Sequence, residues 1–440
     1  MSTMLRMKDR IPSISGSVIS TQYDPSLVLR TGLSIGMTSF FLVAQMAGAG
    51  FLALPRALAD TGFLGVAMMI IFCGSVAFSA TRLGRCRMIL EERWPEYKDT
   101  IRQPYMEIAY RALGIGGRRA ALVSVIINLY GSTTVYIILI SQMVSSMEDV
   151  LSTCALVLIV GTCLIPLSWL GTPKDFWQAS IMAVVSTVVA VVVIIIQLFI
   201  EKPSLPEPWY PNPTVGSFSL GFGAILFAFG GSAVFPTVQN DMKERSQFWK
   251  SALVGFAVIL SLYLPVAVSG YSILGNDVES NILTSVSEGV VVQIAISLEI
   301  VNLVSTYVIS INPVVQSVEE ILSIPNKFGI KRVLVRSSMV IVQMVICLAI
   351  PDFGLILNLI GGSCITLNTF IFPPLMYMKL MDQKDPSWPE RSMPLWERVY
   401  LIQIICVGVV GGLAATVSAF IAILDPNNFG MNCFVNFSGL

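Results

Sequence analysis

The stretch "QMAGAGFLALPRAL" (residues 45–58) interrupts the first long apolar run of this 440-residue chain. Gly48 and Gly50 lie in the middle of the run, and Pro55 comes five residues after Gly50. A later apolar run repeats the arrangement in "FAFGGSAVFP" (227–236), where Pro236 comes five residues after Gly231. Small residues allow close helix packing in membranes, which accounts for one such motif taken alone. Two matching interruptions far apart in the chain favour a functional role.

The composition is typical of a protein that crosses a membrane many times. The chain is 55% hydrophobic and 12% charged, which is about half the charged fraction of a soluble domain. Runs of about 20 apolar residues, enough to cross ~30 Å of hydrocarbon as a helix, occur near 32–58, 62–83, 120–142, 153–170, 179–200, 216–239, 251–274, 289–312, 333–351, 354–377 and 398–424. The sequence therefore predicts an all-α polytopic membrane protein with 11 transmembrane helices.

The positions of Lys and Arg orient these helices. With a cytosolic N-terminus, 25 of the 27 basic residues fall in cytosolic segments, and only Arg56 and Lys202 lie on the other side. Cys154 and Cys433 also fall on that other side, so a disulfide between them is compatible with this topology. We expect a cytosolic tail (1–31), a first repeat (32–200) with a cytosolic basic loop (84–119), a second repeat (216–377), a last helix (398–424) and a non-cytosolic C-terminal tail (425–440).

The absence of histidine excludes several kinds of chemistry. Without His the chain has no His-ligated metal, no His-ligated haem and no His-dependent nucleophilic catalysis. The apolar runs also carry no paired carboxylates and no nucleophile motif. We therefore expect no enzyme, no metal site and no cofactor. The expected partners are the lipid bilayer and a small-molecule ligand, and no nucleic acid.

The two interruptions fall in the first and sixth spans, where two five-helix repeats would begin. Gly-interrupted helices at corresponding positions of two such halves indicate the binding site of a transporter. A break exposes carbonyl groups at the end of one half-helix and N–H groups at the start of the next. An amino acid fits these groups, because its ammonium binds carbonyls and its carboxylate binds N–H groups. The predicted substrate contacts are Ala47, Gly48, Ala49, Gly50, Phe229, Gly230, Gly231 and Ser232, with Asn128 of the third span in the pocket wall.

The eighth span carries an acidic residue near the middle of the membrane. Glu299 lies about ten residues into this span, and hence ~15 Å deep. Such a residue is expensive in the membrane and by default functional. It could take up a proton, bind a cationic side chain, or hold Na⁺ together with Asn302, Ser305 and Thr306; a purely structural, protonated Glu is the alternative. Asn312 and Pro313 are expected to end this helix.

Arg56, just past the first interruption, has two interpretations. It either extends to the outer membrane interface, which we favour, or lines an outer vestibule. Phe227 and Phe229, beside the second interruption, are candidate gate residues. The polar residues of the third span, among them Tyr130, Thr133 and Tyr136, are expected to serve mainly in packing and interhelical hydrogen bonds.

Longer stretches resemble the amino acid/auxin permease family of eukaryotic transporters. The resemblance runs along nearly the whole chain past the tail, with "GAGFLALPRALADTGFLG" (48–65), "YMEIAYRALG" (105–114), the block 222–275 and "LNLIGGSCITLNTFIFPPLMYMKL" (357–380). The segments "GGSAVFPTVQNDM" and "INPVVQSVEEI" are most similar to the vesicular, vacuolar and lysosomal branches. Arg56 departs from many members, which carry an aromatic or small residue there.

This resemblance implies a LeuT-like fold: a five-plus-five inverted repeat plus one helix, with helices 1 and 6 broken. It also implies secondary active transport of amino acids, by symport or antiport, coupled to H⁺ or Na⁺. The protein would lie in a vesicular, vacuolar or lysosomal membrane or in the plasma membrane. The alternative is a receptor of the same fold that binds an amino acid without moving it.

Overall fold

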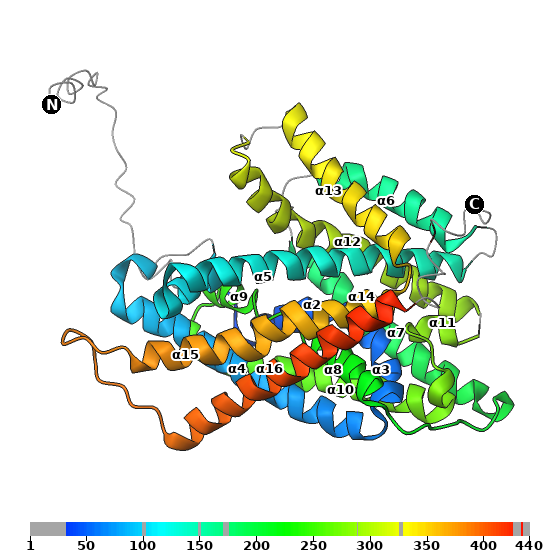
Figure 1. Ribbon diagram of the computed structural model, residues 1–440, viewed down its shortest axis with the longest axis horizontal. Helices are drawn as coiled ribbons and strands as arrows, with labels where there is room; N and C mark the ends of the chain where they lie inside the picture. Colours follow the sequence, from blue (N-terminus) through cyan, green and yellow to red (C-terminus); the bar gives the residue numbers. More distant parts are fainter. Residues whose placement is uncertain are drawn as a thin grey trace, which may run out of the picture.

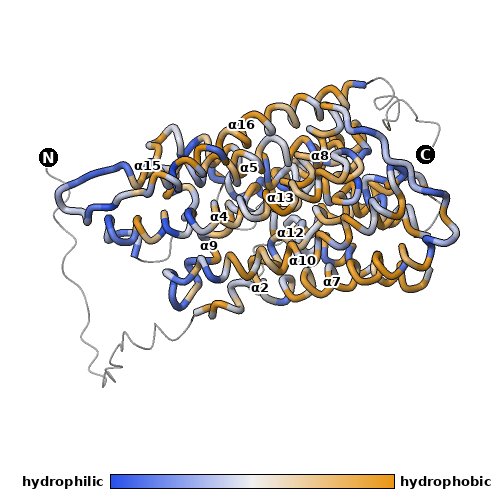
Figure 2. Tube along the Cα trace, turned by 90° about the horizontal axis from the view of Figure 1, so that it is seen from below, coloured by the Kyte–Doolittle hydropathy of each residue, from blue (hydrophilic) through white to orange (hydrophobic). Residues whose placement is uncertain are grey.

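The computed structural model describes residues 32–98, 103–147, 151–169, 176–287, 289–324, 329–425 and 433. Within these residues the regular structure is helical, apart from an isolated bridge between Leu33 and Met242. The helices pack side by side along the long axis of the molecule (Figure 1). Apolar residues run along their length, and polar residues gather toward the two ends (Figure 2).

Eight described helices are long and apolar enough to cross a membrane. They are α4 (Leu64–Arg93), α5 (Pro104–Ser145), α7 (Phe176–Glu201), α10 (Phe248–Leu274), α12 (Val290–Ile321), α13 (Ile330–Ala349), the unit from α14 (Phe353–Ile360) to α15 (Phe372–Asp382), and α16 (Leu395–Leu424). Two shorter apolar helices are α6 (Thr153–Trp169) and α8 (Val215–Ala228). The chain is thus an all-helical, multi-pass membrane protein.

The chain bends sharply in its first apolar run. The Ser34 side chain caps α2 (Ile35–Met46) by accepting a hydrogen bond from the N–H of Met37. After α2 the backbone is extended at Gly48 and then forms the 3₁₀ turn η1 (Ala49–Ala53) and α3 (Leu54–Thr61). Pro55 stands in the first turn of α3, where a missing N–H removes no helical hydrogen bond. The bend between α2 and η1–α3 is 51° and falls at the predicted interruption.

The second interruption separates α8 from the short helix α9 (Phe235–Asn240). Thr214 and Ser217 form a capping box at the start of α8, which ends at Ala228. Gly231, between the two helices, has φ 138°, a backbone conformation that side chains with a Cβ rarely adopt. The sequence therefore places a glycine where the path of the chain requires one.

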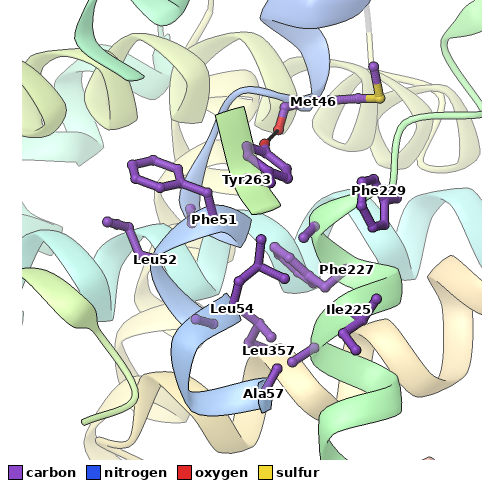
Figure 3. Close-up of a cluster of buried hydrophobic side chains, with 14 of the residues drawn as sticks. Met46, Phe51, Leu52, Leu54, Ala57, Ile225, Phe227, Phe229, Tyr263 and Leu357 are labelled. Atoms are coloured by element: carbon purple, nitrogen blue, oxygen red, sulfur yellow. Dashed lines mark hydrogen bonds between the residues drawn. The ribbon is translucent and has the colours of Figure 1, made fainter. Parts of the chain in front are cut away.

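The two interruptions lie side by side. A Cβ atom at Gly50 would stand 2.6 Å from the Cα of Ala228, so η1 and the end of α8 touch through their backbones. Figure 3 shows both segments in one view, with Phe51 and Leu54 on one side and Phe227 and Phe229 on the other. Residues almost 180 positions apart in the chain thus lie next to each other in the fold.

A polar network fastens α5, α12 and α13 to one another. Gln343 of α13 donates to the Thr133 hydroxyl of α5 (2.7 Å) and accepts from the Tyr307 hydroxyl of α12 (2.7 Å). Tyr130 of α5 donates to the carbonyl of Met339 (2.8 Å). Tyr130 and Thr133 therefore serve in interhelical hydrogen bonds, as their positions in the sequence predict.

The described residues of the stretch 84–119 are mostly helical. Helix α4 continues to Arg93 and α5 begins at Pro104, with a kink at Gly114. Arg87 is fully buried and donates to the Asn240 side chain (2.9 Å). The connections after α4, α9 and α15 gather at this end of the molecule, where Arg245 and Arg391 pair with Glu91 and Glu92. We call it the basic end.

The expectation that Asn312 and Pro313 end their helix is wrong. Helix α12 continues through both residues to Ile321. A proline inside a helix removes one hydrogen bond of the backbone. The next residues, Val314 and Val315, are buried against neighbouring helices, and this packing holds the helix together beyond the proline.

Candidate functional site

The end of α2 points its last carbonyl into the middle of the helix bundle. The Tyr263 hydroxyl of α10 donates to the carbonyl of Met46 (2.7 Å), and both residues are buried (Figure 3). On the other side of the bend, the hydroxyl of Tyr136 stands 3.8 Å from where a Cβ of Gly48 would lie. Helices α5 and α10 thus bring one hydroxyl each to the interruption between α2 and η1.

Three aromatic rings pack around the interruption between α2 and η1. Phe51 of η1 stacks on Tyr263 with ring centroids 6.1 Å apart, and Phe229 lies on Tyr263 at 6.0 Å. All three side chains are essentially without solvent contact. We call Phe51, Phe229 and Tyr263 the aromatic layer. It joins the two interruptions to α10.

Glu299 of α12 lies next to the same place. It is fully buried, and its carboxyl oxygen Oε1 accepts from the Asn302 side chain (3.3 Å). Its carboxyl group lies within electrostatic range of the hydroxyls of Tyr136 and Tyr263, the two that reach the α2–η1 interruption. An ionisable group so deep in the bundle needs a partner or a proton.

The second carboxyl oxygen of Glu299 has no donor of ordinary geometry within the described residues. Ser186 of α7 faces the carboxyl group, but its hydroxyl also bonds to the carbonyl of Ala183 (3.1 Å). The hydroxyl of Ser232 in the second interruption is likewise buried without a partner in the described part of the chain. Buried polar atoms normally have partners, so these two oxygens are places where a ligand or proton could bind.

A large cavity opens at the basic end. Its volume is about 1850 Å³, and its walls come from α2, α5, α7, α9 and α12. We call it the vestibule. Gln45 and Thr306 line its deep part, whereas Lys98, Lys243 and Glu320 line its mouth. Burial raises the pKa of the Asp241 carboxyl at this mouth, and nearby Arg245 opposes the shift.

The opposite end is closed across the same bundle. Arg56 of α3 donates from one guanidinium nitrogen to the carbonyls of Asn276 and Val278, both at 3.2 Å. Its other terminal nitrogen pairs with Asp60 at 3.2 Å. Beside this contact the short helix α11 (Ile282–Ser285) buries Ile282 against the bundle. The described conformation is therefore open at the basic end and closed at the other.

Comparison with known proteins decides the family. A family model described as "Transmembrane amino acid transporter protein" matches residues 31–420. The chain belongs to this transporter family. Among its curated relatives are two proteins of Arabidopsis thaliana named amino acid transporters AVT1B and AVT1C. The first is 26% identical over 95% of this chain and 76% of its own length, and the second 25% identical over 94% and 75%.

Solved structures show that this transporter has the LeuT-like fold. MhsT in complex with L-phenylalanine matches with a TM-score of 0.51 and 11% identity, over 89% of this chain and 99% of MhsT. The inward facing conformation of Mhp1 matches with a TM-score of 0.50 and 13% identity, over 91% of each chain. The family resemblance stated from the sequence is thereby confirmed, and the relatives are named as transporters rather than as enzymes.

The structure of the transporter gathers part of the predicted site residues. Residues 47–50 and 229–232 lie at the two adjoining interruptions, and Glu299 interacts with the tyrosines beside them. Asn302 links Glu299 to Thr306, whose hydroxyl bonds to the Asn302 oxygen (3.3 Å). Ser305 instead bonds to the carbonyl of Val301 one turn earlier (2.9 Å). The substrate and ion contacts themselves stay predictions.

Among the described residues, no hydrogen bond joins Asn128 to this group. Asn128 is buried in α5 and accepts a bond from Ser132 on its own helix (3.4 Å). Tyr263 could not be recognised from the sequence, because it stands in a mainly apolar stretch, "LSLYLPVAV" (260–268), that resembles an ordinary membrane span. Among the described residues, no three His, Cys, Asp or Glu side chains cluster as metal ligands would.

Proposed function

We propose that this protein is a secondary active transporter that moves amino acids across a membrane by alternating access. The observation that carries the proposal is the asymmetry of the bundle. A vestibule leads from the basic end toward the two interruptions, while Arg56 and the aromatic layer close the other end. Membership in a family of amino acid transporters supports this substrate class.

The proposed architecture has 11 spans. The eight long helices, the bent unit of α2 and α3, the helix α6 and the interrupted pair of α8 and α9 add up to this number. Spans one to five and six to ten form the inverted repeats, with breaks in spans one and six. In this arrangement the basic end is cytosolic, because basic residues stay on the cytosolic side.

The disulfide supports this orientation. Cys154 and Cys433, which the sequence places on the non-cytosolic side, are bonded to each other. Disulfides persist in oxidising compartments and are rare in the cytosol. The side away from the basic end is accordingly lumenal or extracellular. Similarity in sequence to the vacuolar and lysosomal branches favours a membrane of such an organelle over the plasma membrane.

The proposed substrate cradle lies between the two interruptions. The ammonium group binds carbonyls at the end of α2, where Tyr263 now donates to Met46, and the carboxylate binds N–H groups at the start of η1. Gly48 leaves the backbone open to the ligand, and Ser232 offers a hydroxyl that has no partner among the described residues. Tyr263 keeps the Met46 carbonyl bonded whenever substrate is away.

Coupling is assigned to Glu299 with Asn302 and Thr306. These three are joined by hydrogen bonds, and Thr306 reaches the vestibule, so an ion from the basic end can approach Glu299 along them. A proton needs only one carboxyl oxygen of Glu299, and its Oε2 has no hydrogen-bond partner of ordinary geometry among the described residues. Na⁺ would need more oxygen ligands, of which Ser305 and Thr306 are the nearest candidates along the helix. We favour H⁺ for this reason.

The test is uptake of a labelled amino acid panel into proteoliposomes with an imposed pH or Na⁺ gradient. We expect accumulation against the amino acid gradient, with a pH gradient as the driving force. Binding without accumulation under either gradient would show a receptor instead. Empty liposomes and liposomes with dissipated gradients are the controls.

A further inference from the structure

The connection between α10 and α12 lies at the closed end of the bundle. We call its residues 276–287, which include α11, the lid segment. Helix α11 lies at the end of the molecule away from the basic end (Figure 1), and it contacts α5 and η1. Its residues Ile282 and Leu283 are buried. The lid segment therefore packs on the first interruption from the closed end.

The first end of the lid segment is bonded to two other parts of the chain. Arg56 of α3 donates to the carbonyls of Asn276 and Val278, both at 3.2 Å. The N–H of Asn276 also donates to the carbonyl of Trp209 in the connection before α8 (2.9 Å). Three hydrogen bonds thus fix the chain where it leaves α10.

The second end of the lid segment is bonded to Glu201, the last residue of α7. One carboxyl oxygen of Glu201, Oε1, accepts from the N–H of Ser287 (2.9 Å) and from the Ser287 hydroxyl (2.5 Å). Gln197, one turn earlier on α7, donates to the same carboxyl oxygen (2.6 Å) and to the Ser287 hydroxyl (3.1 Å). Hydrogen bonds to a carboxylate are stronger than those to a neutral acceptor. Glu201 is therefore the main link between Ser287 and α7.

The lid segment is not fully packed in its closed position. A cavity of about 150 Å³ lies beneath its second half, with Leu283, Ser146 at the end of α5 and Ile296 of α12 in its walls. The side-chain nitrogen of Asn281 is buried and has no partner among the described residues. An empty space loses packing contacts, and an unpaired buried amide costs free energy. The bond to Glu201 therefore matters most where the packing is weakest.

We propose that Glu201 is a positioning residue of the transport cycle, which keeps the lid segment closed by binding Ser287 and so sets how often the cradle opens away from the basic end. This inference rests on the proposed function, because it assigns a role in opening the closed end of a transporter. Removing the carboxylate raises the fraction of molecules in which the lid segment is displaced. An amino acid on that side then binds more readily, because its apparent affinity scales with this fraction.

The first test measures the lid segment without transport. Leu283→Cys is made in a background with the exposed Cys163 and Cys406 replaced by serine, and a membrane-impermeant maleimide is added away from the basic end. Adding Glu201→Ala is expected to raise the labelling rate about tenfold. The matched control is Glu207→Ala, which removes an exposed carboxylate from the connection after α7. Equal labelling rates in the two variants overturn the proposal.

The second test compares half-saturation constants from the two sides, in sealed vesicles of either orientation. Glu201→Ala should lower the constant from the side away from the basic end by about the same factor as it raises labelling, and change the other less than about twofold. Glu201→Gln, which keeps an oxygen that can accept from Ser287, should give intermediate values.

Two further outcomes are decisive. Faster labelling from both ends together with a lower melting temperature means a general loosening, and it overturns the proposal. Unchanged labelling in Glu201→Ala, with transport intact, overturns it and leaves the proposed function standing. If wild type accumulates no amino acid under any gradient, the proposed function fails, whereas labelling raised by Glu201→Ala alone still shows that Glu201 keeps the lid segment closed.

Discussion

Arg56 is the residue whose role changes most between sequence and structure. Its guanidinium ties α3 to the backbone at Asn276 and Val278, a contact that neither interpretation from the sequence included. Charge-assisted bonds of this kind are worth about 1.5–3 kcal/mol each. We predict that Arg56→Gln weakens closure of this end and lowers the maximal uptake rate at least about fivefold. The control is Lys202→Gln, which changes the other basic residue of the same end; equal rates in both variants and wild type would contradict the prediction.

Glu299 offers a separate test of coupling. Glu299→Gln keeps the size of the side chain and an oxygen that can accept from Asn302, but it cannot ionise. We predict that exchange of labelled for unlabelled amino acid continues in this variant, whereas accumulation driven by a pH gradient is lost. Both are measured in the same proteoliposome preparation, so the exchange rate reports correct folding. Accumulation at the wild-type level would remove Glu299 from coupling.

The contact between η1 and α8 makes a prediction about the two interrupted helices. A methyl group at Gly50 would meet the backbone of Ala228, which cannot move aside as a flexible side chain can. Overpacking of this kind costs about 1–3 kcal/mol. Gly50→Ala should therefore lower the melting temperature in detergent and abolish most uptake. In Gly36→Ala, at an exposed position of α2, the added methyl meets open space, and stability should hold or rise. Wild-type uptake by Gly50→Ala would refute the close contact.

The interruptions could be predicted from sequence because glycine and proline act locally. Gly231 has a positive φ, and Pro55 and Pro236 stand at the starts of helices. The residues that mark each interruption are therefore close together in the sequence. The same local rule failed at Pro313, because burial of the next turn kept α12 intact. Tyr263 could not be predicted, since its bond to Met46 depends on how α10 packs against α2.

The family and the LeuT-like fold were predictable for the whole molecule, because composition, apolar runs and long motifs extend along most of the chain. The distribution of Lys and Arg along the sequence predicts which loops form the basic end. It does not predict how the side chains of these loops pack. Arg87 belongs to the stretch 84–119, yet it is a buried residue of α4 that bonds to Asn240 of α9. Counting charges along the sequence shows in which loop a charge lies. It does not show which charges become buried when the chain folds. The sequence likewise could not predict at which end of the bundle the vestibule opens.

The open and closed ends can be probed with single cysteines. Thr237 of α9 lines the vestibule, whereas Leu283 of α11 is buried at the closed end. In a background with the exposed Cys163 and Cys406 replaced by serine, we predict that a membrane-impermeant maleimide added at the basic end labels Thr237→Cys. Leu283→Cys should stay unlabelled from either side without substrate, because this position of α11 is buried against the bundle. Faster labelling of Leu283→Cys from the other end would mean that the resting transporter is open there, and that Arg56 and the aromatic layer do not hold that end closed.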